Sequence, residues 1–460
     1  MGCSKLVATV ISWLTRERLW VFTIAIAILT VLTWAVTQYL GPGMTNLTGA
    51  ILGGDFLGFY TGGKFYLTGH MADLYNLNAN SAFQESIVYP IHYTKLHAFL
   101  YPPFTAVFYS LFSMSGYLEG LSLWVALGLI LLFISVCLVR SEFETFHTYS
   151  SARLFLTTFL FYPTLQWLIS AQNTGLSLFL YVVFFVMLRR GRDLIAGLAL
   201  GLMLYKPQLT LALGLVLLIK QRWQAIAGVV LGSLAWIITG LLTSVAAMKN
   251  YLKIMFLLPN YIRFHPSIET ATVPSPWGVN SFFGFATLLL DNISVTAANI
   301  LFILLSIGGI LAVILIWRSI PWKQGTTEWD LSMAATVVLG LLLSPQLYIY
   351  DLMLLLLPFA IIFAYYASGS PGRVLDGGQL LLWSALLYTT SIVGNPLAFA
   401  QIKLFALMRL PEFGVQIIII VMLGWVAAVL RVRESPRLEK GAITWRGEQS
   451  TRDLATKGQP

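Results

Sequence analysis

The sequence predicts an all-α polytopic membrane protein, and three observations lead to this prediction. First, 58% of the 460 residues are hydrophobic and only 10% are charged, whereas a soluble domain carries about 25% charged residues. Second, apolar runs recur from Trp20 to Arg431, so no separate soluble domain fits between them. Third, the basic residues behind the net charge of +9 sit at the ends of these runs. That placement orients membrane helices and argues against a nucleic-acid partner.

A helix needs about 20 apolar residues to cross the hydrocarbon core of a membrane. The candidate spans are residues 20–40, 118–139, 154–169, 177–188, 194–219, 223–243, 300–317, 331–347, 352–366, 380–392 and 415–430. The first is too long for the apolar core of a signal peptide, so we expect a retained anchor. The fifth is interrupted by Lys206-Pro207, and it is expected to break into two arms because proline lacks a backbone donor.

The Lys and Arg clusters predict the orientation of these spans, since basic residues favour the cytoplasmic side. All clusters are cytoplasmic if the chain reverses at Lys206-Pro207 and if residues 104–115 form a re-entrant or interfacial helix. The alternative, in which residues 104–115 cross and one basic cluster faces outward, stays open. In the first arrangement the two long non-spanning stretches, residues 41–100 and 246–297, are external loops. Residues 1–431 are then one transmembrane domain, and residues 432–460 are a disordered cytoplasmic tail.

Asp55 lies in the stretch GGDFLGFYTGGKFYLTG, between paired glycines and an aromatic run, just after the first span. An ionisable group among Phe and Tyr side chains is costly to desolvate, so it needs a partner or a chemical role. As a general base, Asp55 would take a proton from an acceptor hydroxyl that attacks a sugar carbon. The structural alternative is that Asp55 caps a helix that begins at Phe56.

Lys206 stands in the apolar run LMLYKPQLT, where a lysine costs on the order of 3 kcal/mol unless it pairs, snorkels or faces water. Its ammonium group suits the binding of a phosphate. Equally, the side chain could reach the external interface of the membrane by snorkelling and bind nothing. Arg263 and His265, in NYIRFHP, are further basic candidates for a phosphate.

Several uncharged polar residues fall between apolar runs near the same predicted face. Gln172 and Asn173 in LISAQNTGLS form a loop or bind sugar hydroxyls. Asn280, beside Trp277 in PSPWGVNSFFGF, has the same two interpretations. Asp351 opens the last part of SPQLYIYDLM, either as a second acid or as a carboxylate favoured by a helix dipole.

Metal and nucleotide signals are weak in this sequence. The five histidines show no tight ligand spacing, and there is no paired-aspartate motif of the kind that holds a nucleotide-sugar metal. A phosphate-binding glycine loop with Lys and Ser or Thr is also missing from the sequence. We therefore predict no metal site and no cofactor, and a soluble nucleotide donor is unsupported.

An ordered series of short motifs resembles glycosyltransferase family 87, a family of integral membrane enzymes of the GT-C superfamily that use polyprenyl-phosphate sugars. The series consists of Asp55-Phe56, Phe59-Tyr60, Gly62-Gly63, Gly69, Leu74-Tyr75-Asn76, Tyr101-Pro102-Pro103, Gln172-Asn173, Gly197, Gly201, Lys206-Pro207, Asn280-Ser281 and Ser344-Pro345. Two departures stand out. Ala171 occupies a position where the family often has glycine, and Gln346, Tyr348 and Asp351 follow Ser-Pro where many members carry histidine.

The resemblance implies a GT-C-like bundle of roughly 11–13 transmembrane helices with external interfacial helices, forming one catalytic domain. It implies inverting, metal-independent transfer of a hexose, with mannose favoured, from a polyprenyl-phosphate donor to a lipid or glycan acceptor. Asp55 would be the general base. The expected phosphate ligands are Lys206, Arg263 and Lys64, and the expected sugar or acceptor contacts are Tyr101, Gln172, Asn173, Gln208, Asn280, Gln346 and Asp351. Membrane lipids are the remaining partners, and the bacterial plasma membrane with an external active site is the expected location.

Two other functions fit the same residues. A transporter or flippase of a lipid-linked sugar would also use an intramembrane lysine and broken helices, and it would tolerate Asp55→Asn. A non-catalytic scaffold would use its polar residues only to cap helices. The long external stretch 41–100 disfavours a minimal transporter.

Overall fold

The computed structural model describes residues 16–91, 96–264, 276–367, 378–408 and 414–433, and the predicted tail lies outside this range from residue 434 onward. The regular elements in the described residues are all helices. Five helical segments there are long and apolar enough to cross a membrane, and four shorter helices are also apolar. The prediction of an all-α polytopic membrane protein is therefore confirmed.

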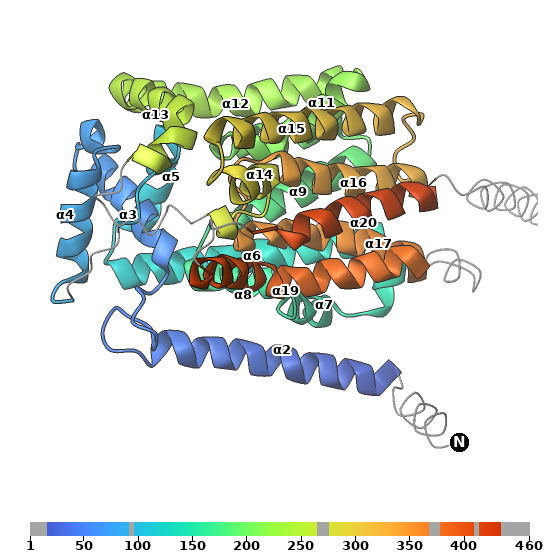
Figure 1. Cartoon of the computed structure of the whole chain (residues 1–460), viewed down its shortest axis with the longest axis horizontal. Coiled ribbons are helices and arrows are strands. Elements are labelled where there is room, and N and C mark those ends of the chain that lie inside the picture. The colour runs from blue at the N-terminus through green and yellow to red at the C-terminus, as the bar shows by residue number, and fades with distance from the viewer. Residues whose placement is uncertain (1–15, 92–95, 265–275, 368–377, 409–413, 434–460) are drawn as a thin grey trace, which may run out of the picture.

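Long apolar helices run alongside one another down the long axis of the molecule (Figure 1). They are α2 (Arg16–Tyr39), α6 (Tyr117–Glu142), α9 (Thr174–Arg189), α12 (Trp223–Thr243), α15 (Val295–Arg318), α16 (Thr327–Leu343), α17 (Leu356–Ala367), α19 (Gly378–Leu407) and α20 (Ile417–Arg433). A large core of buried aliphatic and aromatic side chains fills the space between most of them. Exposed leucines and isoleucines cover the outer faces of α12 and α15, as expected for helices that face lipid.

A second set of helices gathers at the end of the bundle opposite the start of α2 (Figure 1). Four are short, α3 (Gly54–Leu67), η1 (Met71–Asp73), α4 (Leu77–Val88) and α5 (Pro103–Ser113), and the fifth is the 20-residue α13 (Val245–Phe264). A second apolar cluster, built mainly from α3, α5 and the start of α6, holds this end together. With 11 residues, α5 is about 16 Å long, which is too short to cross a membrane. Its length favours a re-entrant or interfacial helix for residues 104–115 over a helix that crosses.

The chain reverses at Lys206, as the favoured topology requires. Before the break lie α10 (Asp193–Leu202) and η3 (Met203–Tyr205), and after it lies α11 (Pro207–Ile219). Arg222, just beyond α11, pairs with Asp193, the first residue of α10, with 2.5 Å between nitrogen and oxygen. The two arms therefore start and finish at the same end of the bundle, and the break sits at the other.

Ion pairs tie the helix ends together where these arms start and finish. Arg189 at the end of α9 lies 3.2 Å from carboxylate oxygens of both Glu142 and Asp330. Arg190 lies 2.6 Å from Glu142. Arg189, Arg190 and Arg222 thus gather at one end of the bundle, far from α3, α4 and α5.

The structure corrects three of the predicted spans. The predicted span 154–169 is broken into α7 (Ser151–Thr158) and α8 (Tyr162–Ser170), because Pro163 starts a new helix. The span 331–347 ends at Leu343, before Pro345.

The third correction concerns the predicted span 380–392, which is part of the 30-residue α19; this helix continues through Pro396. Within the stretch 246–297, the described residues form α13, η4 (Pro276–Gly278) and α14 (Phe282–Leu290). Two 3-10 segments complete the described elements, η2 (Glu144–Thr148) and η5 (Ile349–Leu355), the latter leading into α17.

Glycines let α10 and α12 pack backbone to backbone. A Cβ atom on Gly228 would lie 2.3 Å from the carbonyl oxygen of Leu194, and one on Gly197 would lie 1.9 Å from that of Ala225. Small residues at such positions allow membrane helices to approach closely. The contact fixes α10, and therefore the position of the Lys206 break at its end.

Gly228→Ala is therefore expected to destabilise the protein by about 1–3 kcal/mol, because backbone atoms cannot move aside for the added methyl group. Gly214→Ala is the matched control, since a Cβ atom there meets nothing within 4 Å. That change should leave the melting temperature equal or slightly higher, because alanine favours helix over glycine. Thermal unfolding of the detergent-solubilised protein measures both. Equal melting temperatures for the two variants would contradict the close-packing argument.

Candidate functional site

Asp55 lies in the first turn of α3 and does not cap that helix. The helix begins at Gly54, after Gly53 takes the left-handed conformation with φ of 67°. No side chain caps this helix start. The capping interpretation of Asp55 is therefore wrong, although a carboxylate in the first turn still interacts favourably with the helix dipole.

The Asp55 carboxylate is held from two sides. The side-chain amide of Gln172 donates a hydrogen bond from Nε2 to Asp55 Oδ2 at 3.0 Å. His97 Nδ1 lies 3.5 Å from Asp55 Oδ1. The aspartate side chain is 18% exposed, so it is oriented by the protein and still open to solvent.

Gln172 makes several hydrogen bonds in addition to the one with Asp55. Its Oε1 accepts hydrogen bonds from the Tyr101 hydroxyl at 3.1 Å and from the Asn173 backbone N–H at 2.8 Å. Its own carbonyl oxygen accepts from Trp167 Nε1 at 2.7 Å. The amide is thus engaged by these groups and by Asp55, and it orients the carboxylate. The sugar contact expected for Gln172 stays a prediction.

Lys206 forms a buried ion pair with Asp351. Lys206 Nζ lies 2.7 Å from Asp351 Oδ1, and the two side chains are only 6% and 3% exposed. The Thr174 hydroxyl donates to the same carboxylate oxygen at 2.7 Å. A buried, paired ammonium does not snorkel, so the interfacial interpretation of Lys206 is wrong. Asp351 lies in the first turn of η5, and it serves chiefly as the partner of this lysine.

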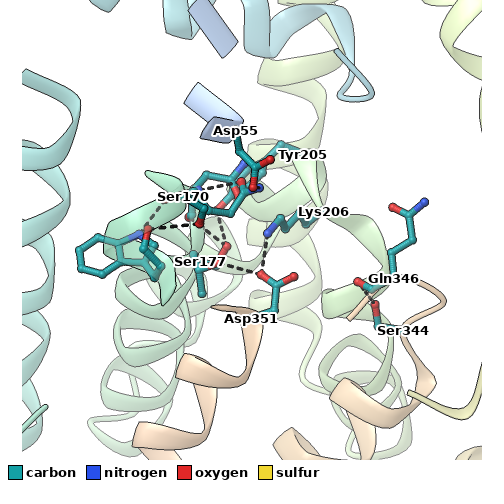
Figure 2. A network of polar contacts seen from close by, with 12 residues as sticks. Asp55, Ser170, Ser177, Tyr205, Lys206, Ser344, Gln346 and Asp351 are labelled. Carbon is teal, nitrogen blue, oxygen red and sulfur yellow. Dashed lines mark hydrogen bonds and ion pairs between the residues drawn. The ribbon is translucent and has the colours of Figure 1, made fainter. Parts of the chain in front are cut away.

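One turn connects Asp55 to the Lys206–Asp351 pair. Gln172 lies between α8 and α9, and Thr174, two residues later, is the first residue of α9. Gln172 contacts Asp55, and Thr174 contacts Asp351. Figure 2 shows both carboxylates and the lysine within one network of polar contacts. The acid and the ammonium, remote in sequence, are thus brought to the same end of the bundle.

The charges of Asp55 and Asp351 affect the pKa values of two tyrosines outside the spans, Tyr101 and Tyr348. Burial raises the pKa of Tyr101 well above its ordinary value, and the charges of Asp351 and Asp55 add to this increase. Burial, followed by the charges of Asp55 and Asp351, likewise raises the pKa of Tyr348. Both hydroxyls therefore remain protonated at neutral pH, and that of Tyr101 donates a hydrogen bond to Gln172 Oε1.

Asn173 and Asn280 are buried in structural contacts. Asn173 is fully buried, and its Nδ2 donates to the Tyr109 hydroxyl at 3.2 Å. Asn280 donates from its backbone to the Leu347 carbonyl at 2.7 Å and from Nδ2 to the Gly278 carbonyl at 3.3 Å. Asn280 therefore fastens its loop to the segment that follows α16.

The remaining predicted ligands lie away from the Asp55 carboxylate or outside the described contacts. Lys64 is nine residues beyond Asp55 on α3, which places it on the opposite helix face, 5.5 Å from the centroid of the Tyr60 ring. Gln346 lies to one side of the Lys206–Asp351 pair in Figure 2. Gln208 is half-buried in the first turn of α11. Arg263 belongs to α13, but its side chain is outside the described part of the structure, as is all of His265.

Sequence reasoning missed two residues that complete the network, His97 and Thr174, and it gave no role to Tyr75, which it named only within the motif Leu74-Tyr75-Asn76. The Tyr75 hydroxyl donates to the Tyr101 carbonyl at 2.6 Å, which fixes the segment that carries Tyr101. His97 and Thr174 gave no signal in sequence, because a single histidine or threonine is common anywhere. Within the described residues, no group of three or more His, Cys, Asp or Glu side chains is placed to hold a metal ion.

The fold and the site define a polytopic membrane protein with an exposed, oriented carboxylate near a buried lysine at one end of the bundle. A comparison with protein families matches glycosyltransferase family 87 over residues 99–345, more than half of the chain. The chain belongs to that family and is a glycosyltransferase. The matched region includes Tyr101, Gln172, Lys206 and Asn280, and it lies between Asp55 and Asp351 in sequence. No curated protein and no solved structure matches the chain.

Proposed function

We propose that this glycosyltransferase transfers a hexose, with mannose as the first candidate, from a polyprenyl-phosphate donor to a hydroxyl of a lipid or glycan acceptor. The observation that carries the proposal is the Asp55 carboxylate, which is partly exposed, oriented by Gln172 and close to the Lys206–Asp351 pair. A general base needs this combination of access and fixed orientation.

The chemistry assigned to Asp55 is a single displacement. Asp55 takes the proton from the acceptor hydroxyl, and the acceptor oxygen attacks the anomeric carbon. The bond from that carbon to the donor phosphate breaks, and its electron pair leaves with the phosphate. Because attack occurs on the face opposite the leaving group, the configuration at the anomeric carbon is inverted.

Lys206 is assigned to the leaving phosphate. An ammonium group has three N–H donors, and the contact with Asp351 uses one of them. The remaining donors are available to stabilise phosphate oxygens as negative charge develops. The pairing with Asp351 holds the ammonium at the helix break, where a lone lysine in an apolar surrounding would be costly.

A small apolar hollow lies beside Gln172. Its volume is only about 10 Å³, and it is lined by the residues Trp124, Val125, Gly128, Leu131, Trp167, Leu168, Ala171, Gln172 and Leu176. The indole nitrogens of Trp124 and Trp167 donate inward to backbone carbonyls of the α8–α9 turn. The wall is therefore almost entirely apolar, but the hollow has room for little more than one water molecule, so the lipid-linked donor is proposed from the membrane-spanning fold and from the lack of a nucleotide-binding motif in the sequence.

The location follows from the distribution of basic residues. Arg189, Arg190, Lys220 and Arg222 lie at the end of the bundle opposite α3, and basic residues favour the cytoplasmic side. We therefore assign Asp55 to the external face of the membrane, in a bacterial plasma membrane by our proposal.

The direct test uses the purified protein in lipid nanodiscs with labelled polyprenyl-phosphate mannose, in parallel with the corresponding nucleotide sugar. We expect transfer from the lipid donor only, and no loss of activity when EDTA is added. Transfer from the nucleotide sugar alone would refute the proposal. Movement of the lipid donor across vesicles without any glycosylated product would instead indicate a transporter.

Gln172→Glu tests the orientation of the base. The variant keeps an acceptor for Tyr101 and Asn173 but replaces the N–H that binds Asp55 with a second carboxylate oxygen. We expect kcat to fall by at least about 10- to 100-fold, because Asp55 loses a hydrogen bond to its charged oxygen and faces a second carboxyl group. The melting temperature should also fall, because position 172 is only 4% exposed and a buried carboxyl group is costly. Tyr101→Phe, which touches Gln172 and not Asp55, should have a smaller effect. An unchanged kcat in Gln172→Glu would show that Asp55 needs no such orientation.

A further inference from the structure

His97 presents its ring to the general base assigned above, although no sequence motif pointed to it. The residue lies 42 positions beyond Asp55 along the chain, on the segment that returns to α3 after α4. Its Nδ1 atom is 3.5 Å from Asp55 Oδ1, and the histidine side chain is 8% exposed. The two groups therefore meet in a largely buried place, where water competes little for their interaction.

The backbone of His97 is fixed by a neighbouring glutamine. Gln84 on α4 donates from Nε2 to the His97 carbonyl oxygen at 2.8 Å and accepts at Oε1 from the His97 N–H at 3.0 Å. The same Nε2 also lies 3.2 Å from the Thr61 hydroxyl on α3. Through these three hydrogen bonds, Gln84 holds the backbone of His97 between α4 and α3.

Glycine on α3 makes room for the histidine segment. A Cβ atom on Gly58 would lie 2.8 Å from the His97 carbonyl oxygen, a backbone atom that cannot easily move. A Cβ atom on Gly54 would lie 3.5 Å from His97 Cε1, an ordinary contact. The helix that carries Asp55 is thus shaped to receive the backbone of residue 97, and the ring lies against the first turn.

The two oxygens of Asp55 are therefore oriented from opposite sides. Gln172 binds Oδ2, and His97 faces Oδ1. In a site without substrate, catalytic hydrogen bonds are often long and shorten when the complex forms. A small movement of the ring would bring the 3.5 Å separation to ordinary hydrogen-bond length.

We propose that His97 is a positioning residue, which donates its Nδ1–H to Asp55 Oδ1 and so fixes the carboxylate for proton abstraction from the acceptor. The inference rests on the proposed function of Asp55 as the base. His97 acts only through Asp55 and does not itself touch the acceptor. Gln84 extends the arrangement by one step, because it holds the backbone that carries the ring.

The kinetic test compares His97→Asn with His97→Leu. Asparagine retains an N–H donor close to the position of Nδ1, whereas leucine fills the space without one. We expect His97→Leu to lower kcat by about 10- to 100-fold with the donor KM changed less than about threefold, and His97→Asn to recover most of kcat. His70→Leu is the control, since His70 is exposed at the end of α3 and bonds Thr68. Equal activity of the leucine variant and the wild type, or equal loss in both His97 variants with intact folding, would overturn the proposal.

A spectroscopic measurement decides the contact independently of activity and of variant folding at position 97. In protein labelled with ¹⁵N-histidine, the wild type should show a protonated, hydrogen-bonded Nδ1 for His97, and Asp55→Ala should shift that resonance. An identical His97 signal in both proteins would overturn the contact. If the wild-type enzyme used no polyprenyl-phosphate sugar at all, the proposed function would fail, and this measurement would still decide whether His97 holds Asp55.

Discussion

Asp55→Asn is expected to lower kcat for sugar transfer by about 10²- to 10⁴-fold, the usual contribution of a positioned general base. Asparagine has nearly the shape of aspartate, and its carbonyl oxygen can still accept the hydrogen bond from Gln172. The side chain loses only the ability to take a proton. The protein should therefore fold normally, and donor binding should change little, because the assigned phosphate ligand is Lys206.

The measurement is initial-rate kinetics with polyprenyl-phosphate mannose, together with thermal unfolding of the same preparation. Asp73→Asn is the matched control, because Asp73 is a carboxylate of the same stretch between the first two long helices, in η1. It should retain wild-type kcat. Undiminished turnover in Asp55→Asn would remove Asp55 from the mechanism and leave the family assignment without its proposed base.

Much of the architecture was predictable because it depends on local composition. Apolar runs of spanning length and the placement of Lys and Arg predicted the helices and the common end of the basic clusters. Lys206-Pro207 predicted the reversal between α10 and α11, since proline cannot continue the hydrogen-bond pattern there. Because the chain reverses at this point, the sequence also predicted that Asp55 and Lys206 lie at the same end of the bundle.

The contacts between those residues were not predictable from the sequence. Lys206 and Asp351 are 145 residues apart, and each was interpreted separately, as a phosphate ligand and as an acid or a dipole partner. Gln172 looked like a loop or a sugar contact, because the sequence does not show that Tyr101, Asn173 and Asp55 converge on its amide. Side-chain pairing across a helix bundle depends on packing register, which no single sequence motif specifies.

The helix breaks show a further limit. The run 154–169 is mostly apolar, so its hydropathy predicts a single membrane span. Pro163 nevertheless starts α8 as a separate helix. Its position matters for the site, because the end of α8 supplies the turn with Gln172 and Thr174. The position of Pro163 within the apolar run therefore predicts the turn that carries site residues, which the hydropathy of the run does not.

Lys206→Met is expected to be the most destabilising of the single changes considered, at about 3–5 kcal/mol. Methionine fits the space of the lysine chain, but it leaves the Asp351 carboxylate buried without its cation. The side chains of the pair are 6% and 3% exposed, so solvent cannot compensate for the loss. Arg222→Met, which breaks the Arg222–Asp193 pair, should cost less. The Asp193 side chain is only 2% exposed, but the guanidinium side chain is 32% exposed, so water can enter the space that it leaves, and Gln324 Nε2 still lies 3.4 Å from the carboxylate.

The double variant Lys206→Met/Asp351→Leu separates the structural role of the pair from the chemical one. Replacing a buried ion pair with apolar side chains of similar size is often neutral for stability, so the double variant should recover most of the melting temperature lost in Lys206→Met. Sugar transfer should not recover, because the ammonium assigned to the leaving phosphate is still missing. If activity returned together with stability, Lys206 would be only a structural partner of Asp351, and the phosphate would have to be bound elsewhere in the site.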